Sequence, residues 1–157
     1  DLIAPDARVY RIDDAELERV RASSPVMWKK PGARPKLAFI GCPHLSATQL
    51  ERWAGDICEG LAAAGHRRVQ VPTVLTAAPA VAEAFRKTDA YACLATTGAV
   101  VSSICPLMYT NNPLCGGIPI VTNSNKLRTY STARYCTDRE VLECVTTGAL
   151  AWKGGDR

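Results

Sequence analysis

The first residues of this chain that could do chemistry lie in the stretch 41–46, which reads GCPHLS. Cys42, His44 and Ser46 supply a thiol, an imidazole and a hydroxyl at alternate positions. The apolar run Leu37–Ile40 before them predicts a buried strand, and the sequence after them predicts a helix. Because ligands of open α/β sheets bind at the edge where strands end, we expect a binding site here.

The seven cysteines differ in what their surroundings predict. Cys58, Cys93 and Cys144 fall in apolar segments and are predicted to be plain core residues. Cys42 and Cys105 each precede a proline at the end of an apolar segment, a place from which a thiolate can reach a soft metal. The alternative for each of these two is a buried turn cysteine. No CxxC occurs, which argues against a zinc ribbon or a thioredoxin-type dithiol.

A polar cluster follows the apolar residues 118–122. It contains Asn123, Ser124, Lys126 and Tyr130. These side chains could form a site for an anion or a carboxylate, and the alternative is an ordinary polar turn. His44 is similarly open, since it could be a ligand, a general acid or base, or a residue that stabilises a turn.

Secondary-structure patterns predict the elements that would position these residues. In chain order they are a lead-in 1–12, a helix 13–22, a linker 24–36, a strand 37–40, a helix capped by Ser46 and stopped by Gly65, a strand 69–75, a helix 79–86, a strand 91–95, a short apolar segment 99–104, a loop 108–117, a strand 118–122 and a helix from 137 or 138 to 151. Strands that alternate with helices predict an α/β fold, a three-layer sandwich with a mostly parallel sheet.

Composition excludes several classes of function. The net charge of +4 is modest and the basic residues are scattered, so we expect neither a nucleic acid nor a membrane as partner. No apolar run approaches the roughly 20 residues that cross a bilayer. Without a secretory signal, the predicted location is cytoplasmic, where thiols stay reduced and disulfides are disfavoured. There is no GxGxxG and no GxxxxGK, so a nucleotide loop is not supported.

Three ordered motifs resemble those of the aconitase X family. The string 39–46 resembles that family's GCPHLS signature, and residues 121–126 resemble its TNSxK segment, with Tyr130 where an aromatic residue follows. Between them, Ser103–Cys105 resembles the family's Asp-Thr-Cys element, although Ser103 stands where an acid is usual. The resemblance spans about residues 13–150 and covers the C-terminal portion of the family's large part.

This resemblance implies a hydro-lyase with an iron–sulfur cluster. Bacterial members look like cis-3-hydroxy-L-proline dehydratases and archaeal members act on mevalonate 5-phosphate; the Ala- and Arg-rich composition favours the first. Cys42 and Cys105 would be cluster thiolates, completed by a further cysteine outside this chain. Ser124, Lys126 and His44 would be catalytic, and the substrate, a small hydroxy acid, would be bound by the residues Ser46, Asn123 and Tyr130.

The domain organisation follows from the same resemblance. We expect 1–36 to be a lead-in helix and linker, and 37–152 to be an aconitase X-like catalytic α/β domain. Because the first residue is Asp1, the chain is expected to be a fragment whose partners are the rest of the large part and a small swivelling domain or subunit. Two alternatives remain open, a non-catalytic α/β module for binding or subunit interaction and a thiol enzyme that pairs Cys42 with His44.

Overall fold

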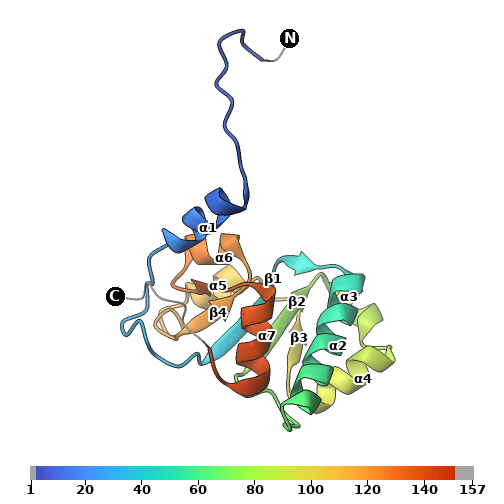
Figure 1. Cartoon of the computed structure of the whole chain (residues 1–157). Helices are drawn as coiled ribbons and strands as arrows, with labels where there is room; N and C mark the ends of the chain where they lie inside the picture. Colours follow the sequence, from blue (N-terminus) through green and yellow to red (C-terminus); the bar gives the residue numbers. More distant parts are fainter. Residues whose placement is uncertain (1–2, 151–157) are drawn as a thin grey trace.

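A five-stranded, all-parallel sheet forms the centre of the structure, a computed structural model that describes residues 3–150 (Figure 1). Its strands are β1 (Leu37–Leu45), β2 (Thr73–Ala77), β3 (Val100–Ser102), β4 (Ile120–Thr122) and β5 (Arg134–Tyr135). The helices of the described residues are α1 (Asp14–Ala22), α2 (Ala47–Ala63), α3 (Pro79–Phe85), α4 (Asp89–Thr96), α5 (Pro106–Thr110), α6 (Asn125–Tyr130) and α7 (Asp138–Thr147). The predicted α/β fold with a parallel sheet is confirmed.

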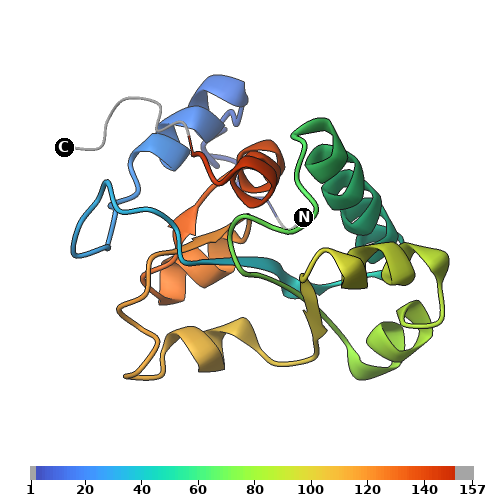
Figure 2. The same ribbon diagram turned by 90° about the horizontal axis from the view of Figure 1, so that it is seen from below.

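Helices cover both faces of this sheet, as Figure 2 shows from below. The apolar run of β1 explains why, because its side chains alternate between two hydrophobic clusters. Ala38 and Ile40 pack against the face that carries α2, α3, α4 and α7. Leu37 and Phe39 pack against the face that carries α5 and α6. A strand buried on both faces needs no polar alternation, which is why this run is continuously apolar.

The strand order β3-β2-β1-β4-β5 places a reversal in the order of strand addition beside β1. From β1 the chain adds β2 and β3 on one side, and then returns to add β4 and β5 on the other side. Helices α2, α3 and α4 of the first half cover one face, α5 and α6 cover the other, and α7 returns to the face of α2. The carboxyl ends of β1 and β4 flank the point of reversal. Ligands of such sheets bind at this position.

The prediction of a strand at 91–95 is wrong, because this segment belongs to helix α4. Thr88 caps the helix by accepting a hydrogen bond from the Tyr91 N–H, and Asp89 lies in its first turn. Two alanines favour helix, and Leu94 alone is fully buried, which is the pattern of one packed face and not of a central strand. The strand of this part of the chain is β3, inside the short apolar segment predicted at 99–104.

Several other boundaries differ from the prediction. Helix α5 lies largely within the expected loop 108–117, and α6 and β5 occupy residues for which no element was predicted. The last helix ends at Thr147, because Gly148 adopts the left-handed conformation (φ 72°) that terminates helices. Its predicted end, Ala151, lies outside the described residues, as does the last part of the range 37–152.

The second strand and the linker also differ in detail. The strand predicted at 69–75 starts at Thr73, after Pro72, which has no N–H for a strand ladder. Within the predicted surface linker 24–36, Trp28 is only 6% exposed and joins the core on the α2 face. The helices of Asp14–Ala22, Ala47–Ala63 and Pro79–Phe85 agree with their predictions.

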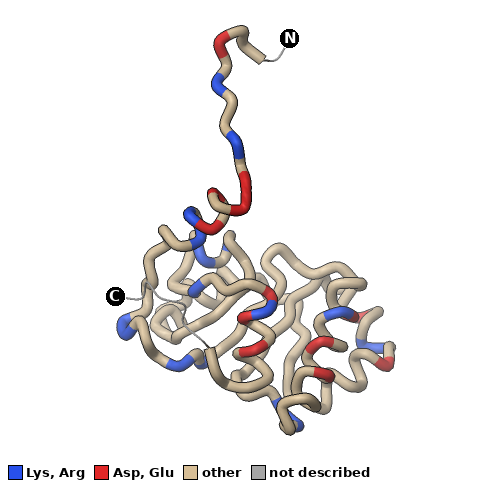
Figure 3. Tube along the Cα trace, viewed as in Figure 1, with Lys and Arg blue, Asp and Glu red and all other residues tan. Residues whose placement is uncertain are grey.

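Helix α1 and the segment before it lie at the periphery. Residues 3–13 extend away from the sheet (Figure 1), and α1 buries none of its side chains. Arg21 of α1 reaches Glu140 of α7, with 3.3 Å between guanidinium and carboxylate. Lys and Arg residues are spread among acidic ones along the described chain (Figure 3). Within residues 3–150, no helix has the length and apolar character needed to cross a membrane.

Candidate functional site at the carboxyl edge of the sheet

The predicted motif forms a bulge at the carboxyl end of β1. Ile40 pairs with Leu75 and Leu45 pairs with Ala77, so β1 advances five residues while β2 advances two. The extra residues leave the ladder and are pushed out at the sheet edge, as expected of an irregular strand end near a site. The prediction had placed this segment in a turn after the strand, whereas the structure places it within β1.

Gly41 is the residue that allows this bulge. Its φ of 106° is one that side chains rarely adopt, and a Cβ built on it would lie 2.4 Å from the Thr76 carbonyl oxygen. The buried Thr76 hydroxyl donates a hydrogen bond to the Gly41 carbonyl at 2.5 Å, which fixes the bulge from the β2 side. The peptide bond from Cys42 to Pro43 is cis.

Cys42 and Ser124 meet where β1 and β4 end. The Ser124 hydroxyl donates a hydrogen bond to the Cys42 carbonyl, and its oxygen accepts one at 2.9 Å from the N–H of Leu127. Ser124 is therefore the N-cap of α6 and is only 4% exposed. The half-buried Cys42 packs against the hydrophobic cluster of Leu37 and Phe39, and its thiol is free of any disulfide.

His44 and Ser46 complete the edge formed by β1. His44 is exposed, and its Nε2 lies 3.5 Å from the carbonyl oxygen of Ile104, the residue before Cys105. Cys105 is exposed at the start of α5, so the chain that follows β3 extends toward the bulge of β1. Ser46 accepts a hydrogen bond from the Gln49 N–H at 3.2 Å and so caps α2 as predicted.

Asn123 belongs to a charged network that the sequence did not reveal. Its Nδ2 donates to Oδ1 of Asp138 at 2.8 Å, and Oδ2 of Asp138 accepts from Nη2 of Arg52 at 2.7 Å. These three residues come from the end of β4, the start of α7 and the middle of α2. No sequence spacing links them, because only the sheet order brings their elements together. Thr76, which holds the Gly41 carbonyl, is another residue of the site that the sequence analysis did not identify. The one signal that could have pointed to it is a hydroxyl residue inside an otherwise apolar strand.

Lys126 and Tyr130 lie one helical turn apart on α6, and both are exposed. The structure therefore places them at the same edge as Ser124 but on the solvent side of the helix. Between them, Arg128 hydrogen-bonds the side chain of Asn125 and lies 5.8 Å from the ring centre of Tyr135. The arrangement leaves the Lys126 ammonium available to an anionic ligand. Arg128 has a partner at Nη2, whereas its buried Nη1 has no hydrogen-bond partner among the described residues.

The thiols at this edge suit an iron–sulfur cluster in type but not in number. Cluster irons are held by several cysteine thiolates, usually four. Cys42 and Cys105 are the candidates at this edge, and in residues 3–150 no group of three or more His, Cys, Asp and Glu side chains could hold a metal ion. The described residues therefore supply only part of the ligand set that an iron–sulfur cluster needs.

The remaining cysteines include two that differ from the prediction. Cys58 of α2 and Cys93 of α4 form a disulfide, and Cys93 is exposed, so neither is a plain core residue. Cys144 is buried as predicted, and burial raises the pKa of its thiol to about 11. Burial and the nearby Glu140 raise the pKa of Cys136 to about 12. Such thiols stay protonated and unreactive at neutral pH.

Comparison with known proteins bears on both the fold and the family. A family model described as "Aconitase X third domain" matches residues 35–147. The crystal structure of the holo form of Thermococcus kodakaraensis aconitase X is similar in fold, with a TM-score of 0.64 and 21% sequence identity. The match covers 85% of this chain and 33% of that one, so the chain spans about a third of that protein's length. No curated protein matches the sequence.

Proposed function

The chain belongs to the aconitase X family, and from that premise we propose that it forms one wall of the active site of a hydro-lyase that dehydrates a small hydroxy acid. The observation that carries the proposal is the location of the family-like motifs. Cys42 and Ser124 meet at the reversal point of a parallel sheet, where ligands bind in such folds.

We propose that the substrate is cis-3-hydroxy-L-proline, with mevalonate 5-phosphate as the alternative. Both compounds carry a carboxylate and a β-hydroxyl, so both need a cation for the first group and assistance for departure of the second. The exposed ammonium of Lys126 is suited to the carboxylate. Asn123, whose orientation is fixed by Asp138, together with Ser46 and Tyr130, would contact the remainder of the substrate.

Dehydration requires removal of a proton next to the carboxylate and loss of hydroxide, a poor leaving group. His44 is exposed beside the bulge and is the candidate group for moving a proton. Lys126 and Ser124 are the other proposed catalytic groups. The Ser124 hydroxyl donates a hydrogen bond to the Cys42 carbonyl, so it would first have to leave that hydrogen bond. As it stands, Ser124 orients the bulge that presents Cys42.

We propose that Cys42 and Cys105 contribute two thiolates to an iron–sulfur cluster that other parts of the protein complete. A bound cluster supplies a Lewis acid with an open position for the leaving hydroxyl. The rest of the large part and a small swivelling domain or subunit are the proposed partners, in line with the chain's coverage of one third of the Thermococcus protein. Within this chain, the role of the two cysteines is to hold the group and not to transfer protons.

The test of the ligands uses the protein that contains this chain together with the other parts of the family's architecture. After anaerobic reconstitution, iron content, visible absorption and EPR are measured for Cys42→Ser, Cys105→Ser and the control Cys115→Ser. Cys115 is a half-buried free thiol in the loop after α5. We expect the first two variants to lose the cluster signal and the control to retain it. Unchanged spectra in both test variants would remove Cys42 and Cys105 as ligands.

The substrate is tested with the same reconstituted protein. Turnover is measured separately with cis-3-hydroxy-L-proline and with mevalonate 5-phosphate, and we expect the first to be dehydrated. Turnover of mevalonate 5-phosphate alone would make that compound the substrate, and the reaction would still be a dehydration.

The second candidate function is a non-catalytic module for binding or subunit interaction. The incomplete ligand set of residues 3–150 is the observation that favours it. Such a module would show neither iron nor sulfide, and no turnover of either hydroxy acid, when it is joined to the rest of its protein. The spectroscopic experiment above therefore separates the two functions.

A further inference from the structure

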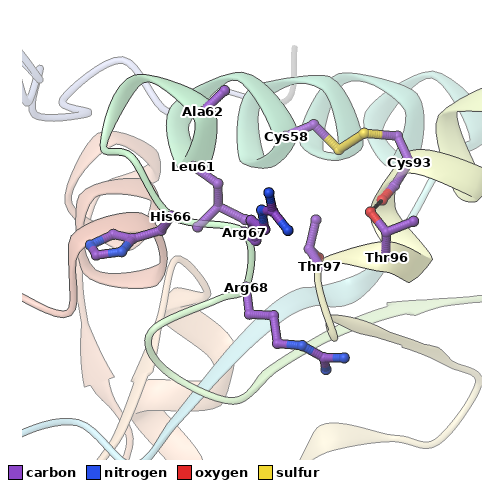
Figure 4. A pocket seen from close by; sticks show the side chains of 9 residues that line it. All are labelled: Cys58, Leu61, Ala62, His66, Arg67, Arg68, Cys93, Thr96 and Thr97. Atoms are coloured by element: carbon purple, nitrogen blue, oxygen red, sulfur yellow. Dashed lines mark hydrogen bonds between the residues drawn. A yellow bond between two sulfur atoms is a disulfide. The ribbon is translucent and has the colours of Figure 1, made fainter.

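A concave site lies away from the carboxyl edge, where α2 and α4 end and the chain enters β2 and β3. It is a pocket of about 470 Å³ (Figure 4). Its lining residues are Cys58, Leu61, Ala62, His66, Arg67, Arg68, Cys93, Thr96 and Thr97. Because β2 and β3 start here and the bulge of β1 lies at the end of its strand, the pocket and the candidate active site occupy opposite edges of the parallel sheet.

The pocket is positively charged. Arg67 and Arg68 are adjacent in its lining, His66 precedes them, and no acidic residue belongs to the lining. Among the described residues, no ion pair involves either arginine. The carboxyl ends of α2 and α4 oppose these charges, but a helix terminus carries only about half an elementary charge. Two such ends amount to about −1 against +2 from the guanidinium groups, so the site stays positive.

Backbone hydrogen bonds fix the segment that carries these arginines. The His66 N–H donates to the carbonyl of Leu61 at 2.9 Å, and the Val69 N–H donates to the carbonyl of Thr97 at 3.0 Å. The two bonds tie the segment 66–69 to the ends of α2 and α4 respectively. The backbone that carries the guanidinium groups is therefore fixed before a ligand binds, so the entropy cost of ordering falls on the two exposed side chains.

A disulfide and side-chain contacts fix the walls of the pocket. The disulfide between Cys58 and Cys93 links α2 to α4 along one side, as Figure 4 shows. On the other side Arg68 passes over Gly98, where a Cβ would lie 3.5 Å from its Nη1. The Thr96 hydroxyl lines the pocket and donates to the Cys93 carbonyl at 2.7 Å. Its oxygen can still accept or be re-oriented toward a ligand.

We propose that this pocket is a binding site for a small anion that carries a phosphate or carboxylate group, held by Arg67 and Arg68. Guanidinium groups recognise both kinds of oxyanion. Those of Arg67 and Arg68 point in different directions in Figure 4, and both side chains are exposed, so they can turn toward a bound anion. The site is independent of the proposed dehydratase chemistry, because it lies at the opposite sheet edge and shares no residue with it. A small metabolite that binds here would act as an effector or as a stabilising ligand, not as the substrate.

The test is a titration of the full 157-residue chain with inorganic phosphate and, separately, with citrate, at constant ionic strength. Amide chemical shifts are followed by ¹H–¹⁵N NMR. We expect saturable shifts confined to residues 61–70 and 93–98, and a dissociation constant at least five-fold larger in the double variant Arg67→Ala/Arg68→Ala. The matched control is Arg8→Ala/Arg11→Ala, which removes the same charge from the lead-in segment and should bind like the unmodified chain.

The two anions distinguish the sources of the oxyanion, since saturation by one of them alone assigns the site to phosphate or to carboxylate. Shifts that fail to saturate with either anion would overturn the proposal. So would equal weakening in the two double variants, which would indicate general screening of charge. Shifts centred on residues 41–46 would also overturn it, because the anion would then bind at the candidate active site. Circular dichroism of each variant checks that the fold is kept.

Discussion

At the scale of single residues, Gly41 sets the geometry of the candidate site. We predict that Gly41→Ala lowers the free energy of unfolding by about 2–4 kcal/mol, because alanine would combine a strained φ with a contact of 2.4 Å to the Thr76 carbonyl. Urea unfolding followed by circular dichroism measures the loss. The bulge would have to move to relieve the contact, so Cys42 would move with it.

The control for this prediction is Gly55→Ala. Gly55 lies inside α2, and a Cβ there would meet nothing within 4 Å. Alanine should be neutral or stabilise the helix by up to about 1 kcal/mol, since it has the higher helix propensity. If Gly41→Ala were as well tolerated as the control, the bulge would not depend on the conformational freedom of glycine.

Ser124 and Lys126 provide a second prediction for single residues. Ser124 is buried and stabilises the fold, whereas Lys126 is exposed and is proposed to bind the substrate. Ser124→Ala removes the cap of α6 and the partner of the Cys42 carbonyl, and should cost about 1–2 kcal/mol of stability. Lys126→Ala removes an exposed ammonium and should change stability by less than about 0.5 kcal/mol. In the complete protein, the Lys126 variant should raise KM for the hydroxy acid. Equal stability losses for the two variants would contradict this separation.

At the scale of elements, Glu140 joins α7 to α1. Its carboxylate accepts hydrogen bonds from the Thr137 N–H at 2.7 Å and hydroxyl at 2.9 Å, and it pairs with Arg21. Burial alone would raise the pKa of Glu140, but the bonds from Thr137 and the charge of Arg21 outweigh it and lower the pKa. A lowered folded-state pKa means stability that is present above the unfolded pKa and lost as the pH falls through the folded one.

We therefore predict that Glu140→Gln destabilises the chain by about 0.5–1.5 kcal/mol at pH 7, since glutamine keeps the capping bond and loses the charge. The difference between variant and unmodified chain should persist at pH 5 and shrink below about pH 4. Urea unfolding at a series of pH values measures it. Glu143→Gln, on the exposed side of the same helix, is the matched control and should change stability little at any pH.

Elements also show how far the sequence could be read. The run Leu37–Ile40 predicted a strand and the spacing of apolar residues in α2 predicted a helix. Each prediction was correct because each sequence pattern fits only one arrangement of buried side chains. The stretch 91–95 was ambiguous, since a short apolar run fits a strand or a helix equally well and only the packing of α4 on α2 decides. The partners of Asn123 could not be predicted, because the contact with Asp138 depends on the order of strands and not on local sequence.

At the scale of the whole molecule, the disulfide between Cys58 and Cys93 is the cross-link between two helices of one face. It closes a loop of 35 residues, for which chain entropy predicts about 4 kcal/mol of stabilisation. We predict that the denatured, unreduced chain has five titratable thiols, those of the residues 42, 105, 115, 136 and 144, and that reduction raises the number to seven. Titration with a thiol-specific reagent in denaturant measures both numbers.

Reduction should also lower the stability of the unmodified chain by about 2–4 kcal/mol, because the freed helices lose their tether in the unfolded ensemble. The control is Cys58→Ser/Cys93→Ser, whose urea midpoint should not respond to the reductant. Since the disulfide is one wall of the anion pocket, its reduction should weaken binding at Arg67 and Arg68 while leaving the bulge at Gly41 unchanged. Seven thiols before reduction would show that the cross-link does not form, and the pocket would then be bounded by two free cysteines.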